Sequence, residues 1–153
     1  VRTAAMNACS GKDVPLEIIE RGLKDADCDV RTAAMKLAEA LAMDLTNLPA
    51  SRTIEPPDRV YKKCVGDVIV VAEIPKDADI RGSLDGKCRA SKAKIIDIIG
   101  DMHGIKVGIS LYDKKTAYFI GDEVVIPNFD YSNEECSYGF HFFCNRKLAE
   151  DYN

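Results

Sequence analysis

Residues 58–74 read DRVYKKCVGDVIVVAEI, and this stretch predicts a β-hairpin. Val60, Lys62 and Cys64 alternate with Tyr61 and Lys63, as the residues of a strand do. Gly66-Asp67 supplies the turn, and the β-branched run after it forms the second arm. The stretch therefore indicates an antiparallel sheet in the second half of the chain.

Further apolar segments bounded by Gly and Asp predict more strands of the same sheet. They are residues 94–99, 105–112, 118–120, 123–126 and 138–143. Asn145 then suits the N-cap of a short helix in which Leu148 and Tyr152 share a face. Residues 58–153 therefore predict a compact antiparallel sheet domain with a C-terminal helix.

The first fifty residues have a different composition. All eleven aromatic residues lie from Tyr61 onward, whereas residues 1–50 contain ten alanines. The chain opens VRTAAMNAC, and residues 30–38 read VRTAAMKLA, so six residues recur in register 29 positions apart. The repeated unit is predicted to be a short helix, a turn over residues 24–29, and a longer helix.

Residues 23–35, with aspartates in the turn before Val-Arg and small residues, resemble the HEAT repeat signature. The resemblance covers residues 1–48 and implies a short HEAT-like array, because a single helix pair cannot bury its apolar stripe alone. It implies that Asp27 and Arg31 join neighbouring repeats. The pattern ends near residue 48, so the following domain is expected to cover the last helix pair.

These observations predict an α+β protein with three parts: a HEAT-like α-solenoid fragment over residues 1–48, a linker over residues 49–57, and the antiparallel β-rich domain of residues 58–153, which caps the array. The linker carries three prolines, which cannot continue a helix. Because the chain starts inside a repeat and without Met, we expect it to be a piece of a longer protein.

The second half also resembles an uncharacterised bacterial and phage domain. The resemblance rests on Val-Tyr-Lys-Lys at 60–63, Ile-Pro-Lys-Asp-Ala at 74–78, Lys-Cys-Arg-Ala at 87–90, and residues 135–143 with Ala149 and Tyr152. That domain closes repeat arrays, including those of pentapeptide-repeat proteins. It brings no activity to this chain, and Asn145 and Leu148 depart from its usual helix start.

Composition excludes several classes of function. The net charge of −4 is spread along the chain, so nothing recruits nucleic acid or an anionic membrane by long-range charge. No apolar run approaches the roughly 18–20 residues that span a bilayer. The six scattered cysteines are expected to be reduced thiols in a cytoplasmic protein.

Two arrangements of cysteine and histidine could carry chemistry. Cys88, Cys136 and His141 could form a thiol–imidazole site for nucleophilic catalysis in an enzyme or toxin-like effector. The competing interpretation is a buried cysteine pair and a histidine whose ring bonds to backbone. Gly139 to Tyr152 also resembles an element of ADP-ribosyltransferases, but His103 lies in a predicted turn and the later acidic residue is missing.

The second arrangement is a zinc site made of Cys88, Cys136, His141 and Cys144, with Cys64 as a substitute ligand. Zinc requires four ligands in tetrahedral geometry, usually supplied as close pairs. Here His141 and Cys144 would point to opposite faces of one strand, because side chains alternate. The sequence therefore favours a chain without cofactor or metal, a non-enzymatic scaffold that binds another protein.

Overall fold

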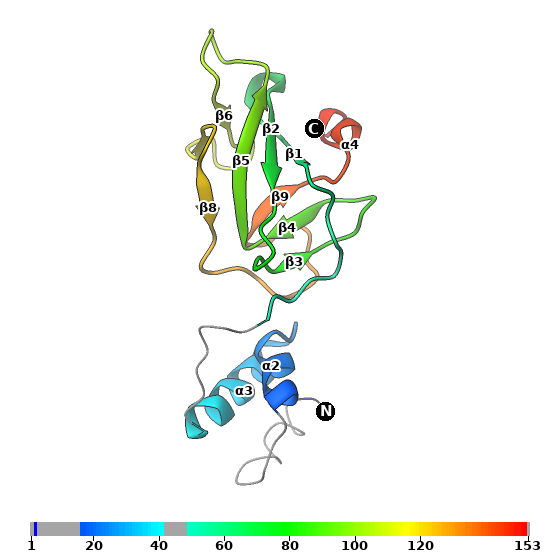
Figure 1. The fold of residues 1–153 in the computed structure, drawn as a ribbon, viewed down its shortest axis with the longest axis vertical. Coiled ribbons are helices and arrows are strands. Elements are labelled where there is room, and N and C mark those ends of the chain that lie inside the picture. Colours follow the sequence, from blue (N-terminus) through cyan, green and yellow to red (C-terminus); the bar gives the residue numbers. More distant parts are fainter. Residues whose placement is uncertain (1, 3–15, 42–48, 153) are drawn as a thin grey trace. The chain divides into compact units, whose positions relative to one another are not determined.

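The computed structural model describes residues 2, 16–41 and 49–152, which belong to two compact units (Figure 1). The first unit comprises Val1–Pro49 together with Asp130–Asn133, and the second comprises Ala50–Phe129 and Glu134–Asn153. Each unit has its own core of buried side chains. They are described in turn.

The first unit is a helix pair, α2 (Leu16–Leu23) and α3 (Cys28–Ala40). Asp27 is the N-cap of α3, and its side chain accepts a hydrogen bond from the Asp29 N–H at 2.8 Å. Such a cap satisfies one of the N–H groups that a helix start leaves free. The two helices share a small core, which consists of Ile19, Leu23, Val30, Ala33, Ala34, Leu37 and Ala38.

The predicted HEAT-like solenoid is wrong. Among the described residues there is one helix pair; apart from Arg2 and the short helices η1 and α4, the other described residues form sheet, turn and loop. The first copy of the repeated sequence, residues 1–9, lies outside the described residues except for Arg2. The helices were predicted correctly because amphipathic spacing is local, whereas stacking requires further pairs.

Arg31, which the resemblance assigned to contacts between repeats, instead closes its own turn. Its Nη1 donates to the carbonyl oxygens of Asp25 and Ala26 at 2.7 and 3.0 Å. Asp25 also forms an ion pair with Arg2, the residue in register with Arg31 in the first copy, at 3.0 Å. The repeated Arg therefore binds the turn from both positions.

The second unit is built around a four-stranded antiparallel sheet in the order β1-β2-β5-β8 (Figure 1). Its strands are β1 (Val60–Lys63), β2 (Ile69–Glu73), β5 (Lys92–Ile99) and β8 (Glu123–Val125). The predicted hairpin is confirmed as β1 and β2, with Val60 opposite Ala72. Gly66 and Asp67 turn the chain with φ of 73° and 59°, a region that Gly enters without penalty and Asp tolerates.

Two smaller sheets complete the unit. One contains β3 (Ile80–Arg81), β4 (Cys88–Ala90) and β9 (Phe140–Phe142) in that order, and the other pairs β6 (Gly108–Ile109) with β7 (Ala117–Tyr118). The remaining elements are the short helices η1 (Val65–Asp67) and α4 (Arg146–Glu150). Asn145 caps α4 as predicted and accepts from the Lys147 N–H at 2.8 Å.

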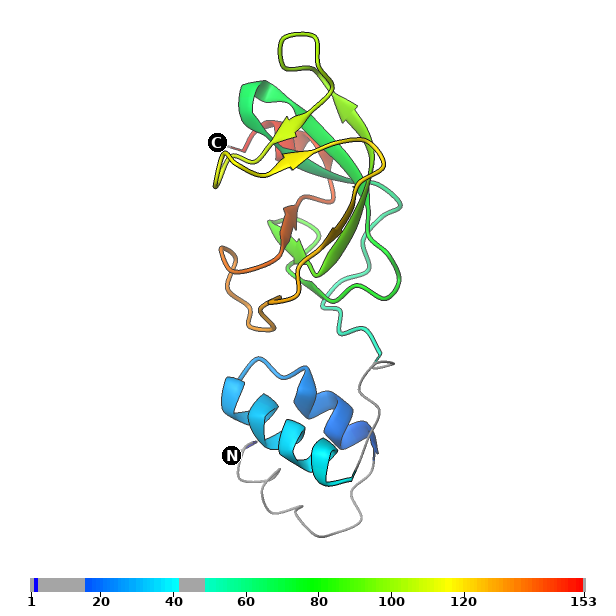
Figure 2. The ribbon, with the colours of Figure 1, turned by 90° about the vertical axis from the view of Figure 1, so that its left-hand side faces the viewer.

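The backbone pairing of the two larger sheets closes into a ring, and Figure 2 shows the strands curving around it. One side of the ring is continuous chain, because Ser91 alone separates β4 from β5. On the other side Tyr61 of β1 and Phe143, next to β9, exchange N–H···O bonds of 2.8 and 2.7 Å. The pairings of β1 with β2, β2 with β5, and β4 with β9 complete the circuit.

Apolar side chains from every strand of this ring form the main core. The largest fully buried ones include Phe140, Phe142, Ile80, Ile95, Ile98, Val60, Val68 and Val70. The Tyr118 ring meets the Phe140 ring edge-on, with 5.7 Å between centroids and 88° between planes. This is the geometry that aromatic pairs prefer.

Candidate functional site

The register of β4 and β9 sorts the candidate side chains onto two faces. Cys88 lies opposite Phe142, and Arg89 lies opposite His141. Since successive residues of a strand point to opposite faces, Cys88 points with Phe142 into the core while His141 points away from it. Cys144 packs against the core, so His141 and Cys144 lie on different faces as the sequence predicted.

Cys88 is fully buried, and its Sγ donates to the carbonyl oxygen of Ser83 at 3.0 Å. The neighbouring Cys144 thiol together with burial raises the pKa of Cys88. The neighbouring Cys88 thiol lowers the pKa of Cys144. Cys88 is therefore a buried thiol, and its neighbour Cys144 is half-buried.

His141 is partly buried, and its Nε2 lies 3.1 Å from the carbonyl oxygen of Glu135. Burial, together with the positive charges of Lys62 and Lys87, lowers the pKa of His141 to about 4. The ring is therefore neutral near pH 7, and Nε2 donates its hydrogen to Glu135.

Cys136 is exposed and accepts a hydrogen bond from Lys87 Nζ at 3.4 Å. Lys87 also donates to the hydroxyl of Tyr152 at 3.1 Å. Burial lowers the pKa of Lys87, but these two hydrogen bonds outweigh it and raise the pKa. Among the hydrogen bonds of the described residues, none joins Cys88, Cys136 and His141 to one another, so the structure does not assemble a thiol–imidazole pair.

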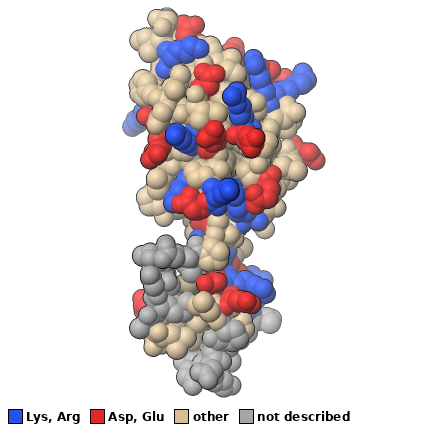
Figure 3. Space-filling view, viewed as in Figure 1, with Lys and Arg blue, Asp and Glu red and all other residues tan. Residues whose placement is uncertain are grey.

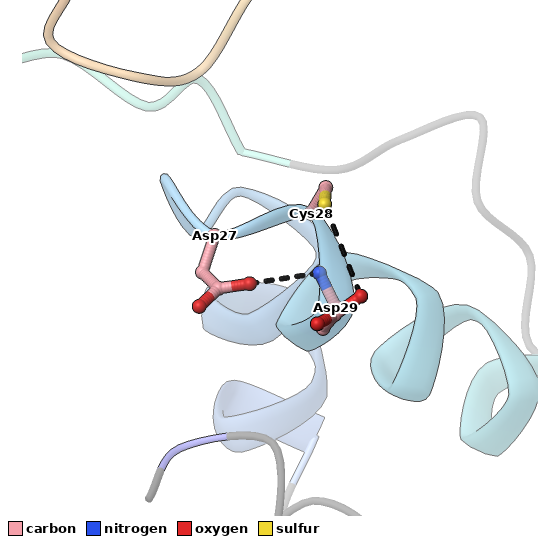
Figure 4. A group of neighbouring side chains, drawn as sticks. All are labelled: Asp27, Cys28 and Asp29. Atoms are coloured by element: carbon pink, nitrogen blue, oxygen red, sulfur yellow. Dashed lines mark hydrogen bonds between the residues drawn. The ribbon is translucent and has the colours of Figure 1, made fainter.

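The zinc alternative requires several ligand atoms around one point. In the part of the chain that the structure describes, three potential ligand atoms lie within 4.8 Å of one another only at Asp27, Cys28 and Asp29, and all three side chains are exposed (Figure 4). The hydrogen bonds drawn there are the N-cap bond of α3 and a contact from Cys28 Sγ to Asp29 at 3.9 Å. Helix capping accounts for this group.

Sequence reasoning missed the environment of Lys62. The alternation of Val60, Lys62 and Cys64 places this lysine on the core-facing side of β1, where its Nζ donates to the carbonyl oxygen of His141 at 3.2 Å. The Nζ also lies over the rings of Tyr118 and Phe140, at 5.8 and 5.3 Å from their centroids. Burial lowers the pKa of Lys62 to about 8. The sequence signal for this environment was the position of Lys62 between Val60 and Cys64, on the face of the strand that apolar residues occupy.

A pocket at α4 holds charged groups that satisfy one another. Lys63 contacts Asp67 at 3.2 Å and donates to the Glu150 carbonyl oxygen at 2.7 Å, while Arg146 pairs with the Glu150 carboxylate at 2.6 Å. The pocket is lined by Lys63, Asp67, Ile69, Ile99, Gly100, Arg146 and Glu150. The bond from Lys63 anchors α4 to β1. Because the charged side chains that line the pocket already pair with one another, they do not indicate a bound ligand.

Basic and acidic side chains are intermixed on the visible face of the sheet unit (Figure 3). This fits the mild net charge of −4. In the described residues, no helix is long and apolar enough to cross a bilayer.

The pKa of His141 leads to a pH prediction. Because the folded pKa is about 4 and the ordinary value is 6.5, the unfolded state binds a proton more readily between these values. The contribution of His141 to stability is therefore complete above pH 6.5 and is lost as the pH falls toward 4. Denaturant titrations should show that the wild type loses more stability between pH 7 and 5 than His141→Gln. Equal losses in the two proteins would contradict the prediction.

Comparison with known proteins adds one finding. A family model described as "Family of unknown function (DUF5758)" matches residues 47–149. No curated protein and no solved structure matches the chain.

Proposed function

The chain belongs to the DUF5758 family, a family of unknown function, and from that premise we propose that it is a non-enzymatic protein-binding module. In this proposal the free edge of β8 accepts an extended segment of a partner protein as an additional antiparallel strand. The proposal includes a cytoplasmic location and the resemblance of the sheet unit to the C-terminal domain of pentapeptide-repeat proteins.

The observation that carries the proposal is the hydrogen-bonding pattern of β8. Ile126 N–H donates to Ser91 and Asp122 C=O accepts from Ile95, so the even-numbered residues face β5. The N–H and C=O groups of Glu123 and Val125 consequently point the other way. In the described part of the chain β5 is the one strand paired with β8, which leaves this edge open to another strand (Figure 1).

Apolar side chains are exposed along the same segment. Val125 is 58% exposed, and Phe119 and Ile120, between β7 and β8, are 49% and 52% exposed. Monomeric proteins usually blunt such an edge with charge, proline or a covering loop. Exposed apolar groups beside unpaired backbone groups favour strand addition, in which backbone bonds provide affinity and alternate side chains provide specificity.

The charges around β8 define the chemistry of the partner. Val125 lies opposite Lys92 and Glu123 opposite Lys94 on the outer face of the sheet. An added strand would therefore place one side chain next to Val125 and another next to Glu123, two positions apart. We expect an apolar residue at the first position and a basic residue at the second.

The enzyme alternative has weaker support. Cys88, Cys136 and His141 each have a different hydrogen-bond partner, and the imidazole already donates to backbone. General-base catalysis by His141 would require it to reach a thiol. The edge of β8, in contrast, can accept an added strand without any rearrangement of the backbone.

Short peptides selected from a displayed library should bind this edge, and Val125→Pro should weaken their binding at least tenfold. Proline removes the outward N–H of residue 125, while the Ile126 bond to Ser91 stays in place. Tyr112→Lys, a change at a residue 92% exposed in another turn, is the control and should bind normally. Calorimetry gives the affinities, and amide shifts in NMR spectra locate the site.

A charge exchange tests the register. Glu123→Lys should weaken binding of a peptide with a basic residue at the facing position, and a peptide with an acidic residue there should restore it. Equal binding by Val125→Pro, or amide shifts confined to another face, would contradict the proposal. Turnover of a substrate that depends on Cys136 or His141 would favour the enzyme instead.

A further inference from the structure

A lysine, a cysteine and a tyrosine of the second unit form a cluster that strand binding does not use. Lys87 Nζ donates to Cys136 Sγ at 3.4 Å and to the Tyr152 hydroxyl at 3.1 Å, and it lies 5.0 Å from the centroid of the Tyr152 ring. Cys136 is an exposed free thiol, and Lys87 is half-buried. An amine and a thiol are therefore in direct contact at the surface.

Three segments that are far apart in the sequence build this cluster. Lys87 directly precedes β4, Cys136 lies in the turn before β9, and Tyr152 follows α4. The antiparallel pairing of β4 with β9 brings the first two together. The Tyr152 ring packs against the ring of Phe143, with 5.3 Å between centroids, and this contact brings the third. The sheet therefore positions all three side chains.

The turn that carries Cys136 is also bonded to the sheet. On one side of Cys136, the carbonyl oxygen of Glu135 lies 3.1 Å from Nε2 of His141. On the other side, the carbonyl oxygen of Tyr138 accepts from Nη1 of the buried Arg89 at 2.8 Å. These two bonds to side chains of β4 and β9 keep the sulfur within reach of the lysine.

The two exposed thiols of the described residues lie beside opposite charges. Cys28 Sγ contacts the Asp29 carboxylate at 3.9 Å (Figure 4), whereas Cys136 Sγ contacts an ammonium group. Cysteines that react with oxidants are exposed and lie in electropositive surroundings. The remaining described cysteines are buried or half-buried, namely Cys64, Cys88 and Cys144. Among the described thiols, Cys136 is therefore the best placed to react.

We propose that Cys136 and Lys87 form a modification site at which a peroxide produces a sulfenamide, a covalent bond between Sγ and Nζ. A cysteine sulfenic acid condenses with a second thiol or with a nitrogen atom, and the group in contact with Cys136 is an amine. Lys87 takes the part that a second cysteine plays in a disulfide. The site is independent of the strand-binding edge on β8, and the new bond links the start of β4 to the turn before β9.

The reaction balances with hydrogen peroxide as the oxidant. The Cys136 sulfur attacks one peroxide oxygen, the O–O bond breaks, and the leaving hydroxide takes the thiol proton to become water, which leaves a sulfenic acid. Lys87 Nζ gives one proton to solvent and attacks the Cys136 sulfur. The S–O bond then breaks, and the leaving hydroxide takes a second proton from the nitrogen. Sulfur loses two electrons, and one hydrogen peroxide is reduced to two waters.

The test treats the reduced full chain with a small excess of hydrogen peroxide at mildly alkaline pH and follows it by mass spectrometry. We expect a loss of about 2 Da, corresponding to two hydrogens, and a fall in free thiols from the six of the sequence to five. A disulfide would give the same mass but would consume two thiols. Fragmentation should show one cross-link, between Cys136 and Lys87, and dithiothreitol should restore the original mass.

Variants assign the two roles. Cys136→Ser should abolish the cross-link. Lys87→Arg keeps the positive charge but removes the nucleophilic amine, so oxidation should stop at a sulfenic acid on Cys136 that dimedone traps. Cys28→Ser, at the other exposed thiol, and Lys147→Arg, at a lysine whose side chain is 81% exposed, are the matched controls and should form the cross-link as the wild type does. Circular dichroism checks that Lys87→Arg folds, and Cys136→Ser provides the test if it does not.

The proposal is overturned if Lys87→Arg shows the same mass loss as the wild type, because the amine would then play no part. It is also overturned if two thiols disappear with each mass loss, or if Cys136 gains oxygen atoms without forming a cross-link. Val125→Pro should form the cross-link as the wild type does, so a failure of strand binding at β8 would leave this site standing by itself.

Discussion

Phe142→Ala should lower the free energy of unfolding by about 3–5 kcal/mol. The Phe142 ring is 1% exposed and lies in the main core, directly opposite Cys88. Truncation to alanine loses the transfer free energy of the ring and leaves a cavity inside a closed ring of strands that can collapse little. Urea titration followed by circular dichroism measures the change.

The control for this prediction is Tyr112→Ala. The Tyr112 side chain is 92% exposed, so removal of its ring should change the free energy of unfolding by less than about 0.5 kcal/mol. A Phe142→Ala protein within about 1 kcal/mol of the wild type would mean that the ring does not fill the space between the sheets.

Lys62→Met should raise the free energy of unfolding at pH 7, by about 1–2 kcal/mol. Burial holds the pKa of Lys62 near 8, against an ordinary value of 10.5, which bounds the penalty for its charge at about 3 kcal/mol. The Tyr118 and Phe140 rings and the bond to His141 offset part of it. Methionine keeps the length and apolar contacts of the stem without the charge.

The pH dependence identifies the cause. The unfolded chain binds a proton at Lys62 more readily between pH 8 and 10.5, so the penalty is complete below pH 8 and disappears as the pH rises to 10.5. The advantage of Lys62→Met should therefore be largest at pH 7 and vanish near pH 10.5.

Lys147→Met serves as the control, because the Lys147 side chain is 81% exposed, with Nζ 3.8 Å from Asp151. It should show no such pH profile. A Lys62→Met protein less stable than the wild type at pH 7 would mean that the rings and the carbonyl oxygen stabilise the cation fully.

Local patterns predicted the elements of this chain with good fidelity. Alternation at residues 60–64 and the Gly66-Asp67 turn predicted β1 and β2, and capping predicted the start of α3 and of α4. These signals depend on neighbours in sequence. The strand predicted for residues 105–112 was reduced to β6, whose two residues pair with β7.

The prediction of a solenoid was wrong because local signals do not specify what packs against a helix. Six matching residues at an interval of 29 specify two similar helical segments, but they do not specify what lies against them. In the structure the small side chains of α3 pack on α2 and form a core of seven residues. The repeated sequence indicates two similar helical segments. The prediction went one step further, to an array of helix pairs, and the described residues do not contain such an array.

For the site, sequence spacing identified the candidates but paired them incorrectly. Cys88, Cys136, His141 and Cys144 were all named, and alternation separated His141 from Cys144 correctly. The nearness of Cys88 to Cys144 depends on which residue of β9 faces Cys88, and the sequence does not contain that register. The position of Lys87, which binds Cys136, depends on the same pairing.

The sequence by itself determined the hairpin, the helix pair with the N-cap of α3, the boundary between the alanine-rich and aromatic-rich halves, and a mild net charge that favours neither nucleic acid nor membrane. Each follows from residues within a few positions of one another. Only the tertiary structure decided the closed ring of strands, the free edge of β8, the burial of Lys62 and the contact of Lys87 with Cys136. These depend on strands far apart in the chain, whose register is set by how the whole core packs, because the burial of side chains between β1, β5 and β9 is shared among all of them.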